Sequence, residues 1–432
     1  MGDQMKILLL SDIPPCKNFT AGLVLLQLMK FLPKGSAACY AVVHSSLDAK
    51  LDPELEGMPI RYAVKPRETG LRLLPGKLGI LSSFTSEMYT QYVTIPKLVD
   101  DVVAFAKEFG ADRIWCTLEG QTMFRLAVGV AKRLNLPLHT QVWDPPGWWL
   151  RANSVDFLST KFIMHTFDKA MRLSSSCAAA SWAMAANYNE RYACNAMPVI
   201  PSLDESLCLP PAQKHHGRDT ITIGVAGQLY SQAEWLHLLL MLEHVKWQVA
   251  GKKIVIRLLG RSIYAPANCG VNIEFLGWHA QPETIRLLSE ADILYCPYWF
   301  DAAFEQEARY SFPSKLTTYL AAGRPILFHG PAYASPSLFL EANDAGVLCH
   351  DLSKTTIYSS IEKLIIDENL YARVTNNATQ AFKKFLTTDV MRRQFSKFIG
   401  LDLDKNEPLE NIAEIKVPQQ KQIESVAEAN VS

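Results

Sequence analysis

The sequence has no net charge and no long apolar run, and each absence excludes a class of protein. Lys and Arg number 43, as do Asp and Glu, so the formal charge is zero. A domain built mainly to hold nucleic acid would carry a basic excess, so we expect no nucleic-acid partner. No window approaches the ~18 consecutive apolar residues of a membrane span. The apolar run at 7–10 is too short for a signal sequence and predicts a buried first strand.

Paired cysteine motifs are also missing. The nine cysteines are scattered singly, without a CxxC pair, and most lie in apolar segments such as 114–116 and 294–296. This pattern indicates reduced core thiols in a cytoplasmic protein, and it predicts neither a disulfide framework nor a metal site. Hydrophobic residues make up 49% and charged residues 20% of the 432 residues, as in a globular protein with sizeable cores.

Short apolar runs alternate with longer helical patterns in two successive blocks. The first block predicts strands at 6–10, 37–43, 60–64, 112–117 and 138–143. The second predicts strands at 221–226, 254–259, 273–276, 293–296, 325–328 and 347–349. Alternation of this kind is typical of a parallel sheet with helices on both faces.

The predicted architecture is α/β, with two doubly wound domains of similar size. The domains are expected at 1–205 and 220–400, and the last helix of the second is expected to pack back on the first. Residues 206–219 hold two prolines and no apolar period, as a linker does. Residues 401–432 are polar and charged and predict a disordered tail. Ligands of such sheets bind beyond the carboxyl ends of the strands, here in a cleft between the domains.

The most informative segment is YSFPSKLTTYLAAGRPIL at 310–327. Ser311 occupies the position of a helix N-cap, and Pro313 fits the first turn. Gly323 ends this helix before the next strand. A helix that starts at a strand–loop junction offers free N–H groups and a positive dipole end, which suit a diphosphate. Lys315 adds a cation. The alternative is an ordinary amphipathic helix with a solvated lysine.

Motifs of the second half resemble those of GT-B glycosyltransferases, specifically the retaining family four. Residues 311–316 (SFPSKL) and 319–325 (YLAAGRP) are similar to the donor-site helix of that family. Further similar segments follow in the family's order at 224–229 (GVAGQL), 258–261 (LLGR), 275–278 (FLGW) and 291–297 (ADILYCP). The first half matches weakly.

This resemblance implies a GT-B fold, with two Rossmann-like domains facing each other across a cleft. It implies a metal-independent, retaining enzyme of polysaccharide biosynthesis. Such an enzyme moves a hexose from a nucleoside diphosphate sugar to a saccharide or lipid-linked glycan acceptor, with the donor as substrate and no bound cofactor. The implied donor-binding residues are Gly227, Gln228, Arg261, Ser311, Pro313, Ser314, Lys315 and Thr318.

The sequence departs from the family at four donor-site positions. Two glutamates eight positions apart are usual there, and they fall on Tyr310 and Thr318. Glu307, or Glu305 beside it, would then face the sugar from a shifted loop. The family's diphosphate-binding Arg and Lys fall on Gln228 and about Ala233, so both cations are missing. The diphosphate would depend on the helix N-terminus, Lys315 and either Arg261 or Arg324, of which Arg324 is equally a structural charge.

The acceptor-side candidates follow the strand at 138–143. Asp144 resembles the family's strand-end His or Asp, whose role is to orient the acceptor or stabilise the charge that develops at the sugar carbon. Trp148 and Trp149 suit stacking on sugar faces. The alternative is a strand-terminating turn whose tryptophans pack against the other domain. His139, inside the strand, is interpreted as a core histidine. The loops at 11–22 and 119–122 are further candidates.

Residues 65–77 (KPRETGLRLLPGK) mix basic and apolar side chains. Such a loop suits peripheral contact with an anionic membrane at its inner, cytoplasmic face, where each basic residue contributes ~1 kcal/mol. The alternative is a solvated loop with an apolar underside.

Two functions compete. The first is the active glycosyltransferase, with Asp144, Lys315 and Glu307 as the catalytic residues. The second is a non-catalytic GT-B relative that acts as a binding or scaffolding subunit, which the residues Tyr310, Thr318 and Gln228 favour. The intact Pro-Ser-Lys start of the helix counts against it. A sugar-nucleotide epimerase is a third, weaker option.

Overall fold

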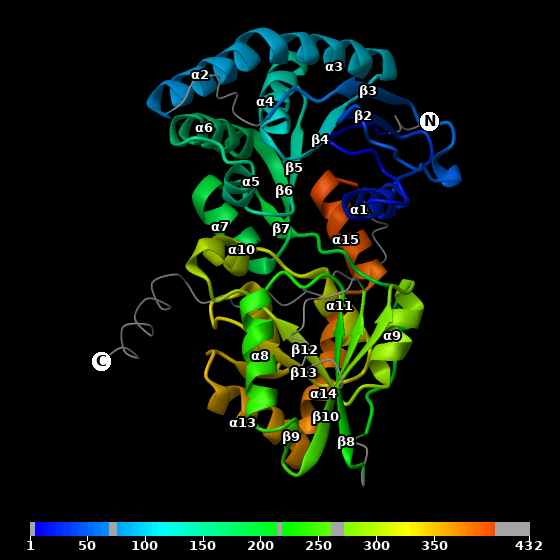
Figure 1. Ribbon diagram of the computed structural model, residues 1–432. Coiled ribbons are helices and arrows are strands. Elements are labelled where there is room, and N and C mark those ends of the chain that lie inside the picture. The colour runs from blue at the N-terminus through cyan, green and yellow to red at the C-terminus, as the bar shows by residue number, and fades with distance from the viewer. Residues whose placement is uncertain (1–4, 69–75, 214–217, 261–271, 402–432) are drawn as a thin grey trace. The chain divides into compact units, whose positions relative to one another are not determined.

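A computed structural model describes residues 5–68, 76–213, 218–260 and 272–401 (Figure 1). These residues form two compact units. The first comprises residues 5–199 and 392–401, and the second comprises residues 200–391. Each unit is an α/β domain of the expected doubly wound kind. None of the helices in the described ranges is long and apolar enough to cross a membrane.

The first unit is built on a parallel sheet in the order β3-β2-β1-β4-β5-β6-β7. Its strands are β1 (Ile7–Ser11), β2 (Ala37–Val43), β3 (Ile60–Val64), β4 (Arg113–Thr117), β5 (Leu138–Val142), β6 (Ser174–Ala179) and β7 (Ala196–Pro198). The chain leaves β1 toward β3 and then crosses to β4, so the strand order reverses between β1 and β4. Ligands of doubly wound sheets bind at the carboxyl ends of the strands beside such a reversal.

Helices cover both faces of this sheet (Figure 1), which is why residues 7–10 are completely buried. The helices are α1 (Thr20–Met29), α2 (Gly76–Tyr89), the π-helical turn η2 (Thr90–Thr94), α3 (Ile95–Phe109), α4 (Gln121–Leu134), α5 (Pro146–Ala152), α6 (Phe157–Leu173) and α7 (Trp182–Tyr192). Part of α15 (Thr388–Ile399) also belongs here, from Arg392 onward. Its Phe395 ring lies 5.0 Å from the Trp115 ring, between centroids.

The second unit has the strand order β11-β10-β8-β12-β13-β14, with β9 added antiparallel to β10. The strands are β8 (Thr220–Ala226), β9 (Gln248–Val249), β10 (Lys252–Leu259), β11 (Ile273–Gly277), β12 (Ile293–Pro297), β13 (Ile326–His329) and β14 (Val347–Cys349). The strand order reverses between β8 and β12.

Its helices are α8 (Gln232–His244), α9 (Gln281–Ser289), α10 (Glu305–Tyr310), α11 (Ser314–Ala321), α12 (Ser335–Ala342), α13 (Lys354–Ile366) and α14 (Glu368–Phe385). The short 3-10 turns of the chain are η1 (Pro53–Leu55), η3 (Glu205–Leu207) and η5 (Ala302–Phe304). Helices α8 and α13 pack over one face of the sheet, around the buried Trp235 and Ile361.

The segment proposed as a linker, 206–219, contacts the end of α11. The Leu209 amide donates to the Ala321 carbonyl (2.8 Å), and the Ala212 amide donates to the Gly323 carbonyl (3.0 Å). Gly323 has φ +65°, and a Cβ there would lie 2.4 Å from the Pro210 carbonyl oxygen. Glycine is therefore required at this position, and the segment fixes the end of the helix that carries Lys315.

Candidate functional site

Glycines mark the carboxyl ends of three neighbouring strands in the second unit. Gly227 after β8 and Gly260 after β10 both have positive φ, +79° and +121°. The Gly227 amide donates to the Leu259 carbonyl (2.9 Å), and the Gly260 amide donates to the Gly277 carbonyl (2.7 Å). A Cβ on Gly260 would lie 3.3 Å from the Gly227 backbone. This edge of the sheet therefore presents backbone with little side-chain cover.

Helix α11 begins beside this edge with free backbone donors. Pro313, with an extended backbone, is the N-cap residue, and no side chain caps the helix. The prediction of Ser311 as the N-cap was wrong, because Ser311 is the C-cap residue of the preceding helix α10. Proline disfavours helical backbone in the residue before it, so α11 cannot extend back through Phe312. Its first N–H groups remain available to an anion.

Lys315, in the first turn of α11, joins the helix to the glycine edge. Its Nζ donates to the Gln228 carbonyl (2.7 Å) and lies 5.9 Å from the centroid of the Tyr230 ring. Burial lowers the pKa of Lys315. Within the described parts of the chain, no carboxylate oxygen lies within 4.0 Å of this ammonium, in contrast to the salt-bridged lysines of the protein. Lys315 is therefore a partly desolvated cation without a counter-ion at the strand reversal.

The other residues predicted to bind the donor differ in their exposure and in their distance from this edge. Ser314 is exposed at the start of α11. Thr318, one turn later, is 8% exposed, and its hydroxyl accepts from the Gln281 side chain (2.8 Å). Glu307 lies in α10 and is only 2% exposed. Arg261 lies outside the described residues. The structure thus brings Gly227, Gln228 and the start of α11 together, and it places the Glu307 carboxylate out of contact with solvent.

Two further side chains at this edge escaped the sequence analysis. Trp278, directly after β11, is 78% exposed, and Tyr230, after β8, is 58% exposed. Arg324, by contrast, is 6% exposed, and its Nε donates to the Ser289 carbonyl (2.6 Å), which is a structural position. The sequence does carry a signal for Trp278, because a tryptophan directly after the strand-end glycine Gly277 falls where ligands of such sheets bind.

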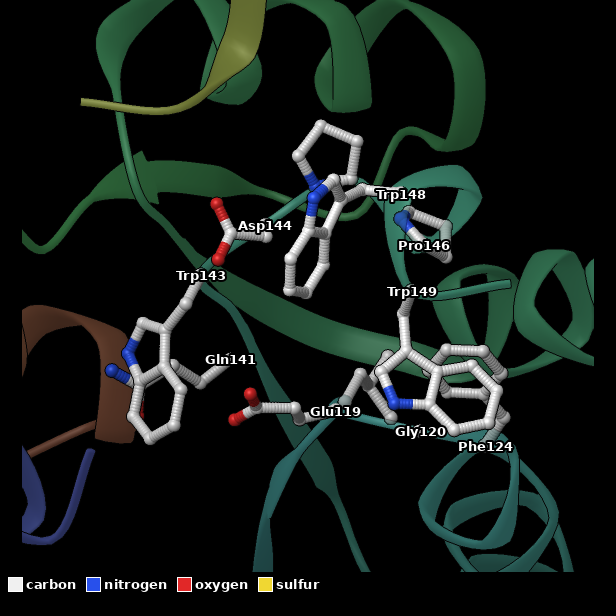
Figure 2. A pocket seen from close by; sticks show the side chains of 11 residues that line it. Glu119, Gly120, Phe124, Gln141, Trp143, Asp144, Pro146, Trp148 and Trp149 are labelled. Atoms are coloured by element: carbon white, nitrogen blue, oxygen red, sulfur yellow. The ribbon is translucent and has the colours of Figure 1, made fainter. Parts of the chain in front are cut away.

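The first unit has a pocket at the carboxyl ends of β4 and β5 (Figure 2). Its cavity volume is only about 20 Å³, and the wider space of about 360 Å³ between its walls includes open solvent. Its walls are Leu118, Glu119, Gly120, Phe124, Gln141, Trp143, Asp144, Pro145, Pro146, Trp148 and Trp149. Asp144 is exposed, and the Trp148 side chain is 38% exposed. The structure therefore gathers Asp144 and both predicted tryptophans around one opening.

The carboxyl group of Glu119, in the wall of this pocket, has a strongly raised pKa. Burial, together with the nearby carboxylates of Asp12 and Asp144, raises the pKa of Glu119 to about 8. Burial also raises the pKa of Asp12, although Lys65 Nζ lies 3.3 Å from its carboxylate. Lys65 is shared with Glu68 (3.0 Å). The raised pKa favours the protonated form of Glu119, which can donate a hydrogen bond to a hydroxyl group.

Two buried N–H groups in the pocket wall have no acceptor among the described residues. They are Gln141 Nε2 and Trp143 Nε1. The orientation of the Gln141 amide is set by Trp115, whose Nε1 donates to Gln141 Oε1 (3.0 Å). A buried donor without an acceptor costs free energy, so an oxygen atom of a ligand or water is the expected partner.

Histidines and metal ligands contribute little to these sites. His139 is 7% exposed, its Nδ1 hydrogen-bonds the Ser176 hydroxyl (2.7 Å), and burial lowers its pKa to about 4. It is a satisfied core residue. Among residues 5–68, 76–213, 218–260 and 272–401, no three His, Cys, Asp or Glu side chains gather in a way that could hold a metal ion.

Comparison with known proteins identifies the fold. The sequence matches no protein-family model and no curated protein sequence. Among solved structures, HepE from Anabaena in complex with UDP is similar over 92% of this chain and 100% of its own, with TM-score 0.62 and 16% identity. Sucrose-phosphate synthase from Thermosynechococcus elongatus matches over 91% and 98%, with TM-score 0.62 and 11% identity.

A third similar structure is the lipopolysaccharide outer core galactosyltransferase WaaB in its apo form. It matches over 92% of this chain and 100% of its own, with TM-score 0.58 and 12% identity. Identities this low show the fold alone. The chain has the two α/β domains of the GT-B fold.

Proposed function

We propose that the protein is a glycosyltransferase resembling retaining family four, which moves a hexose from a nucleoside diphosphate sugar to a saccharide or lipid-linked glycan. The observation that carries the proposal is Lys315, a cation without a counter-ion, beside free helix N–H groups at the strand reversal of the second unit. The similar structures support it, because HepE was solved with UDP and also with UDP-glucose.

The donor diphosphate would lie between the start of α11 and the glycine edge. The N–H groups of Ser314 and Lys315 and the Lys315 ammonium offer it positive charge without a metal ion, and Gly227 lets the diphosphate approach the backbone closely. Trp278 offers an exposed ring on which the nucleobase can stack. In this arrangement Lys315 stabilises the charge that accumulates on the leaving diphosphate.

The acceptor would lie across the mouth of the pocket of the first unit. The Asp144 carboxylate either orients the acceptor or stabilises the positive charge that develops on the sugar carbon. Trp148 offers a stacking face for a sugar ring. Glu119, in its protonated form, donates to a sugar hydroxyl.

A cytoplasmic location with peripheral membrane contact completes the proposal. The loop assigned to that contact, 65–77, falls partly outside the described residues. Within its described part, Lys65 is engaged by Asp12 and Glu68. The contact through this loop therefore stays a prediction.

The competing function is a binding subunit without turnover. It is favoured by Tyr310 and Thr318, which replace both glutamates of the resembled family, and by the burial of Glu307, the proposed substitute. Thr318 is moreover engaged by Gln281.

The deciding experiment measures thermal stability against a panel of nucleoside diphosphates and nucleotide sugars. A ligand that binds only the folded state raises stability by ~2.7 kcal/mol at a hundredfold excess over its Kd. Stabilisation by one nucleotide series, followed by transfer or hydrolysis of that sugar, supports the enzyme. Stabilisation without turnover supports the binding subunit. No stabilisation by any nucleotide contradicts the donor site itself.

A further inference from the structure

The helical run formed by α2 and η2 exposes four large apolar side chains, whereas its polar residues Ser83 and Glu87 are buried. Leu78, Leu81, Tyr89 and Tyr92 are 58–70% exposed. With Thr85 they follow the spacing of one helix face, and we call these five residues the α2 stripe. An ordinary surface helix has the opposite arrangement, so the stripe marks an interaction surface.

Polar contacts on the inner face fix the orientation of this helix. The Ser83 hydroxyl donates to the Asp156 carboxylate (2.8 Å). The Glu87 carboxylate accepts from the Arg125 guanidinium (2.6 Å), and both side chains are at most 3% exposed. Turning the helix to bury the stripe would leave Arg125 buried and unpaired, which is strongly unfavourable. The exposure of the stripe is therefore imposed by the fold of the first unit.

Exposed basic side chains lie on α6 and α3, the helices that contact the α2–η2 run. Helix α6, whose N-cap Asp156 bonds Ser83, begins with the exposed Phe157 and Leu158. Farther along, it exposes Lys161, Lys169 and Arg172 on the side away from the core, and Lys97 is exposed at the start of α3. The partly exposed acid of α6, Asp168, accepts from Tyr192 and Arg191. Asp100 and Asp101, exposed acids of α3, pair with Arg133 and Arg61, so the lysines of these two helices supply net positive charge.

We propose that the α2 stripe docks the first unit on an anionic lipid bilayer. Leucines that enter the boundary of the acyl chains, tyrosines at headgroup level and flanking lysines are the composition of an interfacial helix. A second copy of the chain fits the surface less well, because facing copies would bring like charges together. Loop 65–77 is a different segment, and the proposal does not depend on it.

The helix that carries the stripe belongs to the same unit as the acceptor pocket. A chain of buried contacts connects the inner face of this helix with residues near the pocket. Gln121 Nε2 donates to Glu87 (3.3 Å) and to the Glu68 carbonyl (2.5 Å). Glu68 pairs with Lys65, which pairs with Asp12 near the pocket. Docking would therefore hold the unit that carries the pocket against the bilayer. If the proposed function is right, this favours a lipid-linked acceptor, and only this last clause depends on that function.

The test is co-sedimentation of the full chain with phosphatidylcholine vesicles in which about one lipid in three is the anionic phosphatidylglycerol. Pure phosphatidylcholine vesicles and high salt are the comparisons. Leu78→Ser with Leu81→Ser removes the apolar contact, and Lys161→Glu with Lys169→Glu reverses the charge. Leu240→Ser and Lys253→Glu are matched controls, since both side chains are exposed on the other unit. Circular dichroism checks that each variant is folded.

We expect binding to the anionic vesicles at low salt. Each double variant should bind at least about tenfold more weakly, and the controls should bind like the wild type. Absence of wild-type binding at low salt overturns the proposal, as does binding that the α2 and α6 variants leave unchanged. A wild-type dimer in solution that the leucine variant dissociates also overturns it, in favour of a second copy. None of these binding measurements depends on nucleotide turnover, so the proposal can fail while the proposed function holds.

Discussion

Replacing Lys315 with methionine separates donor binding from folding. Methionine keeps most of the aliphatic stem but removes the ammonium that donates to the Gln228 carbonyl. If this ammonium holds the diphosphate, its loss removes a charge-assisted hydrogen bond worth ~1.5–3 kcal/mol. The affinity for the nucleoside diphosphate should therefore fall by roughly 10- to 150-fold.

The stability of the same variant should hardly change. Burial lowers the pKa of Lys315, which means that the folded state disfavours the charged form relative to the unfolded state. Wherever the lysine is charged, this unfavourable contribution is present, and methionine removes it. The lost hydrogen bond to Gln228 offsets the gain by about 1 kcal/mol. The free energy of unfolding should therefore stay within about 1 kcal/mol of the wild type.

Isothermal titration calorimetry with the nucleotide that stabilises the wild type measures the first effect, and urea unfolding measures the second. Lys253→Met is the matched control, because it removes an exposed lysine of β10 in the same unit. It should bind the nucleotide like the wild type. A Lys315→Met variant with full affinity would refute the assignment of this lysine to the diphosphate. A variant destabilised by several kcal/mol would show that Lys315 is structural.

Three further perturbations test other parts of the reasoning. Trp278→Ala should weaken nucleotide binding by ~1–3 kcal/mol if the exposed ring stacks on the base, whereas unchanged calorimetric affinity excludes that contact. Because the pKa of Glu119 rises from 4.5 to about 8 on folding, urea-measured stability should fall as pH rises from below 4.5 through 8, by up to roughly 5 kcal/mol. Glu119→Gln should remove this decline, and an identical pH profile counts against the protonated acid. Gly323→Ala should lower stability by at least ~1 kcal/mol, since φ is +65° and the Cβ would meet Pro210; a neutral thermal melt contradicts that packing.

The strands and the fold class were predictable because they depend on local pattern. Buried parallel strands such as residues 7–10 appear in sequence as continuous apolar runs, and the alternation with helices indicates doubly wound sheets. The strand β6 was missed, since it begins with three serines, one of which, Ser176, is buried through its hydrogen bond to the Phe398 carbonyl. Such a pairing over more than two hundred residues leaves no local signal.

The candidate sites were predictable only in part, for a similar reason. Lys315 and Asp144 stand at junctions that strand and helix patterns reveal. The raised pKa of Glu119 depends first on burial and then on Asp12 and Asp144, which come from different strand ends and meet only in the fold. The inverted α2 stripe is likewise visible only once Ser83 and Glu87 are known to face inward.

If the proposed function is right, the donor site can hold a diphosphate without cations at Gln228 and Ala233, because of the hydrogen bond between Lys315 and Gln228. An ammonium group has three N–H donors, and the Gln228 carbonyl occupies one of them. The remaining two can reach phosphate oxygens without breaking that bond. The carbonyl thus fixes the position of Lys315 before the ligand arrives, which lowers the entropy lost on binding. A preorganised, partly desolvated lysine at a helix N-terminus attracts a diphosphate more strongly than a solvated lysine does. One such cation can therefore replace part of what two flexible cations supply, and Gln228 contributes through its backbone although its side chain carries no charge.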